Sequence, residues 1–572
     1  MAVLPESLAR AGRDATGSFL AEVPPHLIAE KDPDLFLKPG EFPRGDFLRV
    51  RSNRFIELLQ LELLWEVSVD GTQEQMTQTS AEQPRATESD LQVVETHVSR
   101  LFFVEERVYK SKKPVVNAFL DYSTAEKRQV ACCREVELNS RLAPDSYLGV
   151  LDLSLNGSEV DHVVVMERHP SASRLSARLD DPGVAADLQE VARKILVLHQ
   201  SSPRRDEIDN AASPRAVNRL LIEGFEQLRQ FSTSVLDRIE LNWVEFLALH
   251  YLEGRRVLFD ERVAQGHARD GHGDLQADDI FCLEDGPRIL DCLEFDDQLR
   301  YSDELSDVAF LAMDLERLGH ANLALTFLGF YQDLGARSWP KSLEHFYIAY
   351  RALIRSKVAC MRFHQGEDTA AARAQGLLML AADHLDAASV RLVLVGGLPG
   401  TGKTSIASKI AAETGSELLS SDRIRDELFP RSSSSGSTSF GHGRYSQDRV
   451  RAVYTEMLRR AELMLAGGQH VVLDASWSSE SDRKAAESLA VDYCSFFTEL
   501  RCVCPTEIAH QRIEHRAEEG VDASEATAEI ADGLAAHADL WPTSTLIDTH
   551  TFSQSEAAAQ AVQAVTNRLK DS

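Results

Sequence analysis

Residues 391–404 read RLVLVGGLPGTGKT, an apolar run followed by a glycine-rich turn that ends in Gly402-Lys403-Thr404. The run predicts a buried strand, and SIASKIAAE at 405–413 predicts a helix. Such a turn lets backbone N–H groups surround anionic oxygens, and the helix N-terminus adds partial positive charge. Lys403 is expected to reach the β- and γ-phosphates of ATP, and the Thr404 hydroxyl to hold Mg²⁺. The predicted nucleotide contacts of this P-loop are Gly397, Gly400, Thr401, Gly402, Lys403 and Thr404.

A second candidate phosphate site lies upstream, in RDGHGDLQADDIFCLEDGPRILDCLEFDD at 269–297. Two strand-like pieces surround the turn Glu284-Asp285-Gly286, and Asp291 is expected to end the second of them. Carboxylates on both sides of a short hairpin suit phosphoryl transfer. Asp274 would accept the proton of an attacking hydroxyl, and Asp291 would hold the metal that bridges the phosphates. The alternative is a polar loop and an ordinary hairpin turn.

The chain resembles bacterial fusions of an aminoglycoside-phosphotransferase-like kinase domain with a P-loop small-kinase domain. The resemblance covers most of residues 90–570 and rests on VETHVSRLFFVEERVYKSKKP (94–114), on 119–150, and on HGDLQADDIF and ILDCLEFDDQLR. It implies an α+β protein-kinase-like domain with a small lobe and a helical large lobe, followed by a three-layer α/β P-loop domain. In such kinases a helix glutamate holds a strand lysine. Lys110 resembles that lysine, with Lys112 as the second choice, and Glu135 resembles its partner.

Two features depart from the wider kinase pattern. Asp279 stands five residues after Asp274, where an asparagine is usual; an aspartate can still bind Mg²⁺ but adds negative charge beside the triphosphate. No G-x-G-x-x-G precedes Lys110. A regulatory, catalytically weak kinase-like domain is therefore an open alternative.

The P-loop half carries a second acidic candidate in SELLSSDRIRDELF at 416–429. If a helix begins near Asp422, then Asp422 and Arg425 lie on one side of its first turn. Asp422 could act as general base for a substrate hydroxyl, and Arg425 could grip the substrate or the transferring phosphoryl group. The pair resembles the acceptor site of polynucleotide-kinase and zeta-toxin-like P-loop kinases. The alternative role for Asp422 is a helix N-cap.

Two later segments complete the predicted P-loop site. The strand-like run HVVLD ends at Asp474, from which P-loop proteins direct a carboxylate toward the water shell of the metal. QRIEHRAEE at 511–519 places Arg512 and Arg516 four residues apart. Related kinases use lid arginines to neutralise charge on the γ-phosphoryl group, and Arg516 is the preferred candidate, with Arg512 as a nucleotide contact. A helix with surface salt bridges is the alternative.

Composition narrows the function classes. The formal net charge of −29 disfavours nucleic-acid binding, because phosphate contacts need clustered Lys and Arg. The sequence has neither a membrane-length apolar run nor a signal-like start, so no membrane span or secretion is expected. The eight cysteines lack metal-ligand spacing and are interpreted as reduced thiols of a cytoplasmic protein.

The 572 residues are expected to form an N-terminal extension with a polar linker (1–90), a kinase-like domain (91–388) and the P-loop domain (389–572). Helical patterns dominate the second half of the kinase-like domain.

In FYIAYRALIRSKVACMRFHQ at 346–365, Arg351, Arg355 and Lys357 could meet an anionic substrate or form a solvated face. The residues predicted to form a buried helix stripe are Leu236, Ile239, Trp243, Phe246 and Leu249.

Three functions follow from these patterns. The first is a bifunctional kinase in which each half transfers the γ-phosphoryl group of ATP, with Mg²⁺, to a hydroxyl of a small molecule. The second is a single P-loop kinase regulated by a nucleotide-sensing kinase-like domain. The third, disfavoured by the acidic charge, is a 5′-hydroxyl polynucleotide kinase. The identity of the acceptor and the oligomeric state are not predicted.

Overall fold

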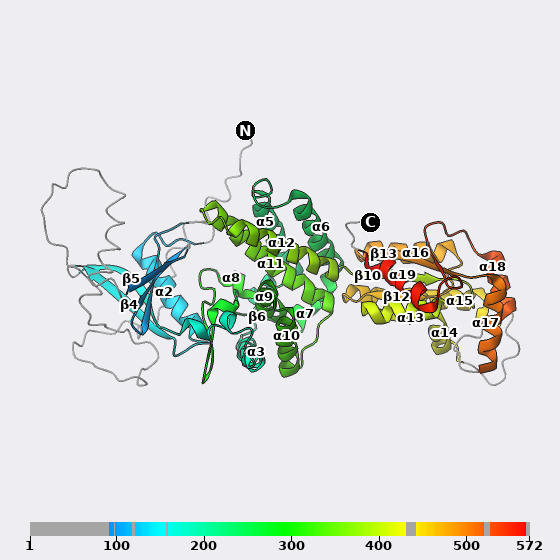
Figure 1. The fold of residues 1–572 in the computed structure, drawn as a ribbon, viewed down its shortest axis with the longest axis horizontal. Coiled ribbons are helices and arrows are strands. Elements are labelled where there is room, and N and C mark those ends of the chain that lie inside the picture. Colours follow the sequence, from blue (N-terminus) through cyan, green and yellow to red (C-terminus); the bar gives the residue numbers. More distant parts are fainter. Residues whose placement is uncertain are drawn as a thin grey trace. The chain divides into compact units, whose positions relative to one another are not determined.

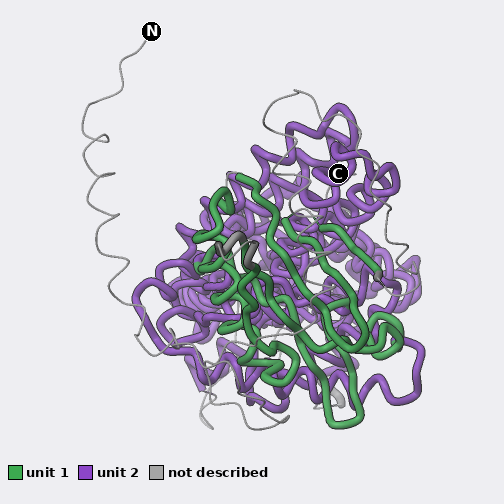
Figure 2. Tube along the Cα trace, turned by 90° about the vertical axis from the view of Figure 1, so that its left-hand side faces the viewer, with its two compact units in different colours: residues 1–178, 278–297 green, residues 179–277, 298–572 purple. Residues whose placement is uncertain are grey.

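The structure is a computed structural model that describes residues 91–567, apart from residue 97 and the segments 117–119, 156–157, 431–441 and 520–526. The extension and linker expected at 1–90 lie outside the described residues. The described chain divides into two compact units (Figure 2). The first runs to Arg178 and includes Asp278–Asp297, and the second contains Leu179–Ala277 and the chain from Gln298 onward.

The first unit is built on an antiparallel five-stranded sheet in the order β1-β2-β3-β5-β4, with helix α2 against it (Figure 1). Val108, Val150 and Val164 on the sheet pack around Cys132 of α2. Thr124 caps α2 by accepting the N–H of Lys127 at 3.3 Å. The sheet and its helix are β1 Leu91–Glu95, β2 Ser99–Val104, β3 Arg107–Lys112, α2 Ala125–Asn139, β4 Tyr147–Leu155 and β5 Ser158–Glu167.

The predicted hairpin is present, but Asp291 does not end its second strand. Strands β7 (Ile280–Leu283) and β8 (Gly286–Ile289) pair antiparallel, so the turn is shorter than predicted and Gly286 belongs to the strand. Asp291 lies two residues beyond β8 with φ of 63°, a left-handed conformation that strand patterns do not reveal.

The segment after Arg178 is mainly helical. Helix α9 is buried on all sides over Glu304–Leu315, which marks it as the central helix of this segment. Helices α11 and α12 pack along each other, and α9 contacts both (Figure 1). The helices are α3 Val184–Ser201, α4 Asp206–Ala211, α5 Pro214–Arg229, α6 Arg238–Gly254, α7 Arg256–Ala264, α8 Asp297–Arg300, α9 Glu304–Arg317, α10 Ala321–Gly335, α11 Lys341–His364 and α12 Ala370–Ala388, with strands β6 Ala268–Asp270 and β9 Tyr301–Asp303.

The P-loop segment forms a parallel sheet in the order β11-β12-β10-β13-β14. Leu392 to Val395 of β10 are all at most 1% exposed, so both faces of this central strand are covered, as expected for a three-layer α/β domain. Helices α13 and α19 contact one another on the sheet, and α15 and α16 contact β12 and β13. Its elements are β10 Arg391–Gly396, α13 Lys403–Thr414, β11 Glu417–Ser420, α14 Ser421–Leu428, α15 Gln447–Ala466, β12 Val471–Asp474, α16 Glu480–Asp492, β13 Phe496–Val503, α17 Thr506–Glu519, α18 Ala528–His537, β14 Thr545–Asp548 and α19 Gln554–Thr566.

Within the described parts of the chain, no helix has the length and apolarity needed to cross a membrane.

Candidate active sites

The loop between β10 and α13 has the backbone of a phosphate cradle. Gly397, Gly400 and Gly402 all have positive φ, at 140°, 83° and 83°. At Gly400 a Cβ atom would overlap the carbonyl oxygen of Ala509, so only glycine fits there. Thr401 closes the turn by donating its hydroxyl to the carbonyl oxygen of Leu398 at 2.7 Å. Lys403 is the first residue of α13, at the positive end of the helix.

Thr404 and Asp474 meet beside this loop. The Thr404 hydroxyl donates to Oδ2 of Asp474 at 2.9 Å, and Asp474 ends β12, which pairs directly with β10. Asp474 is 2% exposed. Burial raises the pKa of its carboxyl, against the opposing charge of Lys403 and the Thr404 hydrogen bond.

The donor set fits magnesium. Oδ1 of Asp474 is buried and has no hydrogen-bond partner among the described residues. Mg²⁺ keeps several waters and is typically held by one or two carboxylates together with substrate phosphates. Among the described residues, no group of three His, Cys, Asp or Glu side chains is arranged to hold a metal ion. Thr404 and Asp474 would therefore hold the ion of a bound Mg-nucleotide.

Asp422 and Arg425 lie on one side of α14, as predicted. The helix begins at Ser421 with Ser420 as N-cap residue, so Asp422 is not the cap. Asp422 forms an ion pair with Arg425, whose guanidinium group also lies 4.8 Å from the ring centre of Tyr445. Burial is the main cause of the raised pKa of Asp474, and the negative charge of Asp422 adds to it, which places this pair within electrostatic reach of the P-loop.

The two arginines of α17 have different surroundings. Arg512 donates to the carbonyl oxygen of Gly400 at 3.3 Å and to that of Thr549 at 2.8 Å, so it ties the helix to the P-loop. Thr549 in turn donates its hydroxyl to the carbonyl oxygen of Thr401 at 2.8 Å. Arg516 lies one turn further along, where its Nε donates to the carbonyl oxygen of Arg512 at 3.2 Å. The P-loop side of α17 therefore carries Arg512.

In the first unit, Lys110 has the partners expected of a nucleotide-binding lysine. Its Nζ lies 2.8 Å from Oε1 of Glu135 on α2 and 2.6 Å from Oδ1 of Asp291. Burial disfavours its charge, but Asp291 and Glu135 outweigh burial and raise the pKa of Lys110 well above its ordinary value. Lys112 is fully buried and pairs with the other oxygen of Glu135 at 2.6 Å and with Glu294. Of the two lysines, only Lys110 contacts Asp291.

Asp279 and Asp291 lie in the same unit, on either side of the hairpin. Asp279 ends a short 3₁₀ turn, and its carbonyl oxygen accepts the N–H of Leu290 at 2.9 Å. The N–H of Asp291 donates to the Tyr147 hydroxyl at 3.2 Å. These two carboxylates are the described candidates for metal binding in the kinase-like half.

Asp274 belongs to the second unit, in a loop held by buried carboxylates. Asp307 of α9 accepts the N–H groups of His272 and Gly273, both at 2.8 Å, and pairs with His199 at 3.0 Å. Burial disfavours the charge of Asp307, yet the hydrogen bond and charge of His199 outweigh it and lower its pKa. The side chain of Asp274 is 28% exposed and lies 3.6 Å from Arg355. A rigid loop thus presents an accessible carboxylate.

Sequence reasoning missed Asp307 and Glu294. Asp307 lies 35 residues after His272, inside a helix whose apolar pattern hides its polar role. Glu294 lies in ILDCLEFDDQLR, three residues after Asp291, and the only signal for it was an acidic residue between two apolar ones. Both are buried acidic side chains that anchor other functional groups.

Comparisons with known proteins agree with this geometry. Residues 392–540 match the family described as AAA domain. An uncharacterized protein of Mycobacterium tuberculosis is 42% identical over 469 residues, which cover 82% of this chain and 94% of the relative. The chain belongs to the family of that mycobacterial protein.

Solved structures also resemble the two halves separately. A choline/ethanolamine kinase family protein from Mesorhizobium loti is 16% identical and covers 53% of this chain and 90% of its own, with a TM-score of 0.34. A gluconokinase from Sinorhizobium meliloti is 14% identical and covers 32% of this chain and 95% of its own, with a TM-score of 0.25.

Proposed function

We propose that this protein is an ATP-dependent phosphotransferase with two transfer sites, each acting on a hydroxyl of a small molecule. The observation that carries the proposal is the contact between Thr404 and Asp474 beside the glycine loop. This contact supplies the hydroxyl and the carboxylate, and the glycine loop supplies the backbone N–H groups, that together bind a magnesium nucleotide. We place the reaction in the cytoplasm, where the eight free cysteines would stay reduced.

In the P-loop half, Asp422 would take the proton of the acceptor hydroxyl, whose oxygen then attacks the γ-phosphorus. The bond from that phosphorus to the β–γ bridging oxygen breaks, and ADP leaves with the electron pair. Lys403 and Arg516 would offset the negative charge on the phosphoryl group, and Arg425 would orient Asp422 through their ion pair. The bound Mg²⁺ supplies charge neutralisation of the phosphates.

In the kinase-like half, Asp274 would accept the hydroxyl proton in the same way. Lys110, fixed by Glu135, would bind the nucleotide phosphates. Asp279 and Asp291 are the carboxylates that would hold Mg²⁺. The rigid support of the loop by Asp307 favours catalysis, because a base must hold its position relative to the acceptor.

The second candidate function is regulation of the P-loop half by the kinase-like half. The direct ion pair between Lys110 and Asp291 favours it, since a magnesium nucleotide must break this 2.6 Å contact to bind. Binding would then be coupled to a local rearrangement.

Separate Lys403→Ala and Asp274→Ala variants of the full chain distinguish the two functions through ADP release on a panel of hydroxyl compounds. Two active sites predict that each variant loses one set of acceptors. Regulation predicts that Lys403→Ala loses all turnover, while Asp274→Ala only changes its rate. Lys409→Ala is the matched control, because Lys409 lies on the same helix in an exposed pair with Glu413. Full turnover in both variants would exclude both functions.

A further inference from the structure

We infer that Thr549, the residue after β14, is a positioning residue of the P-loop half. Its hydroxyl holds the carbonyl oxygen of Thr401 on the side of the loop that faces away from the nucleotide, so that the N–H of Gly402 faces the phosphates. This inference rests on the proposed function, since it concerns how the P-loop binds ATP.

The Thr549 side chain contacts the peptide group that joins Thr401 to Gly402. Its Oγ1 atom donates to the carbonyl oxygen of Thr401 at 2.8 Å. At Gly402, a Cβ atom would lie 3.6 Å from both Cβ and Cγ2 of Thr549, which is ordinary van der Waals contact. Thr549 therefore lies against both residues of this peptide group.

The direction of this peptide group decides whether its N–H can bind phosphate. In a planar trans peptide the carbonyl oxygen and the following N–H point in opposite directions, and no described peptide bond is cis. Because the Thr401 carbonyl oxygen is bonded to Thr549, the N–H of Gly402 points away from Thr549. Gly402 is the N-cap residue of α13, and the first N–H groups of a helix have no partner within it and bind anions.

Gly402 leaves this peptide group free to turn over. Its φ is 83°, and glycine adopts positive and negative φ about equally well because it has no Cβ atom. A rotation of the peptide group would turn the Thr401 carbonyl oxygen toward the phosphates and repel them. The loop therefore needs a contact that selects one orientation, and the hydrogen bond from Thr549 is such a contact.

Thr549 is itself held by two other elements. Its N–H donates to the carbonyl oxygen of Val503, the last residue of β13, at 3.0 Å. Arg512 of α17 donates to the Thr549 carbonyl oxygen at 2.8 Å and to Oγ1 at 3.2 Å. Since the hydroxyl oxygen accepts from Arg512, its hydrogen remains for the bond to Thr401. The side chain is thus oriented before a nucleotide binds.

The alternative is that the Thr549 hydroxyl only completes the end of the sheet, because it also lies 3.3 Å from the carbonyl oxygen of Val503. That oxygen already accepts the N–H of Thr549. The bond to Thr401 is the shorter of the two, at 2.8 Å, so Thr401 is the main acceptor of the hydroxyl.

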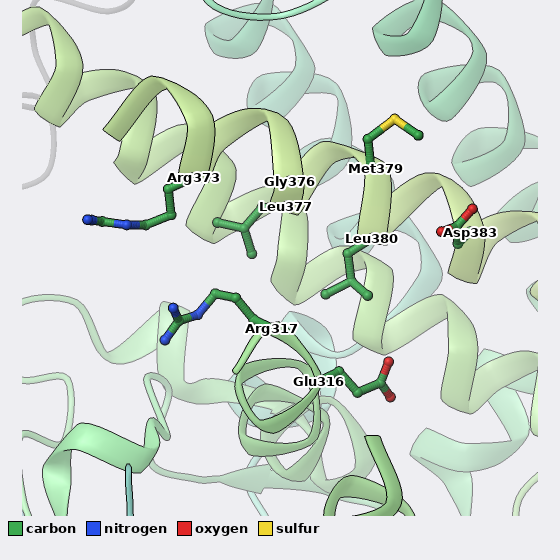
Figure 3. Close-up of a pocket in the computed structure, with 8 residues that line it drawn as sticks. All are labelled: Glu316, Arg317, Arg373, Gly376, Leu377, Met379, Leu380 and Asp383. Atoms are coloured by element: carbon green, nitrogen blue, oxygen red, sulfur yellow. The ribbon is translucent and has the colours of Figure 1, made fainter. Parts of the chain in front are cut away.

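A groove of about 460 Å³ between α9 and α12 is a second feature without an assigned role (Figure 3). Three charged side chains that line it pair with neighbours: Arg317 with Asp314, Arg373 with Glu367 and Glu316 with His384. Because these charges are satisfied within the protein, the groove does not indicate the charge of a ligand. The contacts of Thr549 differ, since they reach the loop that binds the nucleotide.

The test uses the full chain with Lys110→Met, so that binding of ATP reports the P-loop half. Thr549→Val removes the hydroxyl and keeps the shape of the side chain. We expect it to weaken binding of ATP and ADP by about 10–100-fold, while binding of adenosine, which lacks phosphate, is unchanged. Thr549→Ser keeps the hydroxyl and should bind ATP as the parent chain does. Calorimetry measures ATP and ADP, and displacement of ATP measures adenosine at the same site.

Thr549→Ala is a second variant without the hydroxyl and should behave as Thr549→Val does, and thermal unfolding shows which variants are folded. Thr566→Val is the matched control, because the Thr566 hydroxyl donates to the carbonyl oxygen of Val562 within α19 at 2.9 Å. Parental ATP binding in the variants without the hydroxyl overturns the inference, as does an equal loss of adenosine binding or a loss in Thr549→Ser. Failure of the proposed function at this site gives a different result, in which the Lys110→Met chain binds no ATP even with Thr549 intact, and this result overturns both.

Discussion

The hydroxyl of Thr404 and the carboxylate of Asp474 join the first turn of α13 to the end of β12 through one hydrogen bond of 2.9 Å. Because β12 is the neighbour of β10, this bond lies at the carboxyl edge of the parallel sheet. That edge is where open α/β sheets bind their ligands. Buried Oδ1 of Asp474 is left available on the same carboxylate.

The first prediction concerns this pair. Asp474→Asn should weaken binding of ATP with Mg²⁺ by about 10–100-fold, since support of a metal is lost, while binding of ATP in EDTA should hardly change. Thr404→Val should act in the same direction. Calorimetry with and without Mg²⁺ provides the measurement. Thr414→Val is the control, because the Thr414 hydroxyl donates to the carbonyl oxygen of Ile410 at the far end of the helix. Equal losses with and without the metal would contradict the prediction.

The second prediction compares two glycines that have positive φ. Gly400→Ala should abolish ATP binding by the P-loop half, because its Cβ would overlap the Ala509 carbonyl oxygen and displace the loop or α17. Gly415 at the C-terminus of α13 has φ of 66° and open space around its Cβ position. Gly415→Ala should therefore cost only about 1–2 kcal/mol of backbone strain and leave ATP binding intact. ATP titration and thermal unfolding of both variants measure the difference.

Local sequence patterns predicted the parts of the fold that bind phosphate. The strand–loop–helix around Gly397–Thr404 is confirmed as β10 and α13, and the run that ends at Asp474 is confirmed as β12. These patterns succeed because the chemistry requires particular residues at fixed spacing. The Lys110–Glu135 ion pair followed instead from resemblance, since the two residues come from separate elements.

The buried face of α6 shows where such patterns fail. Ile239 and Phe246, predicted to be buried, are 68% and 45% exposed, whereas Leu241 and Val244 are buried. The helix is apolar on more than one side, so its own periodicity does not decide which side packs. The side that packs is decided by tertiary contacts of α6 with α5 and α12. The bend at Asp291 was missed for a different reason, since its left-handed backbone conformation leaves no mark in a strand pattern.

The third prediction separates the two lysines of β3. Lys112→Met leaves Glu294 and one oxygen of Glu135 buried without their cation, which should cost about 3–5 kcal/mol and lower the Tm by roughly 6–20 °C. Lys110→Met should lower it less, since Glu135 keeps Lys112 and Asp291 is 49% exposed. Lys110→Met should instead remove nucleotide binding by the kinase-like half. Thermal unfolding and ATP titration in the Lys403→Ala background measure both effects, and a reversed order would contradict the assignment.

The last prediction concerns His470, whose Nδ1 accepts the N–H of Arg391 at 3.3 Å. Burial, followed by the charges of Arg391 and Arg255, lowers its pKa to about 4. The unfolded chain binds a proton near pH 6.5 and the folded chain does not, so this histidine favours folding above that pH and the contribution is lost as the pH falls toward 4. The loss should reach up to about 3 kcal/mol. In His470→Asn the Oδ1 atom can accept the same hydrogen bond without titrating, so the fall in Tm between pH 7 and pH 4.5 should be smaller than in the parent protein. An equally steep fall in both would show that other groups control this pH range.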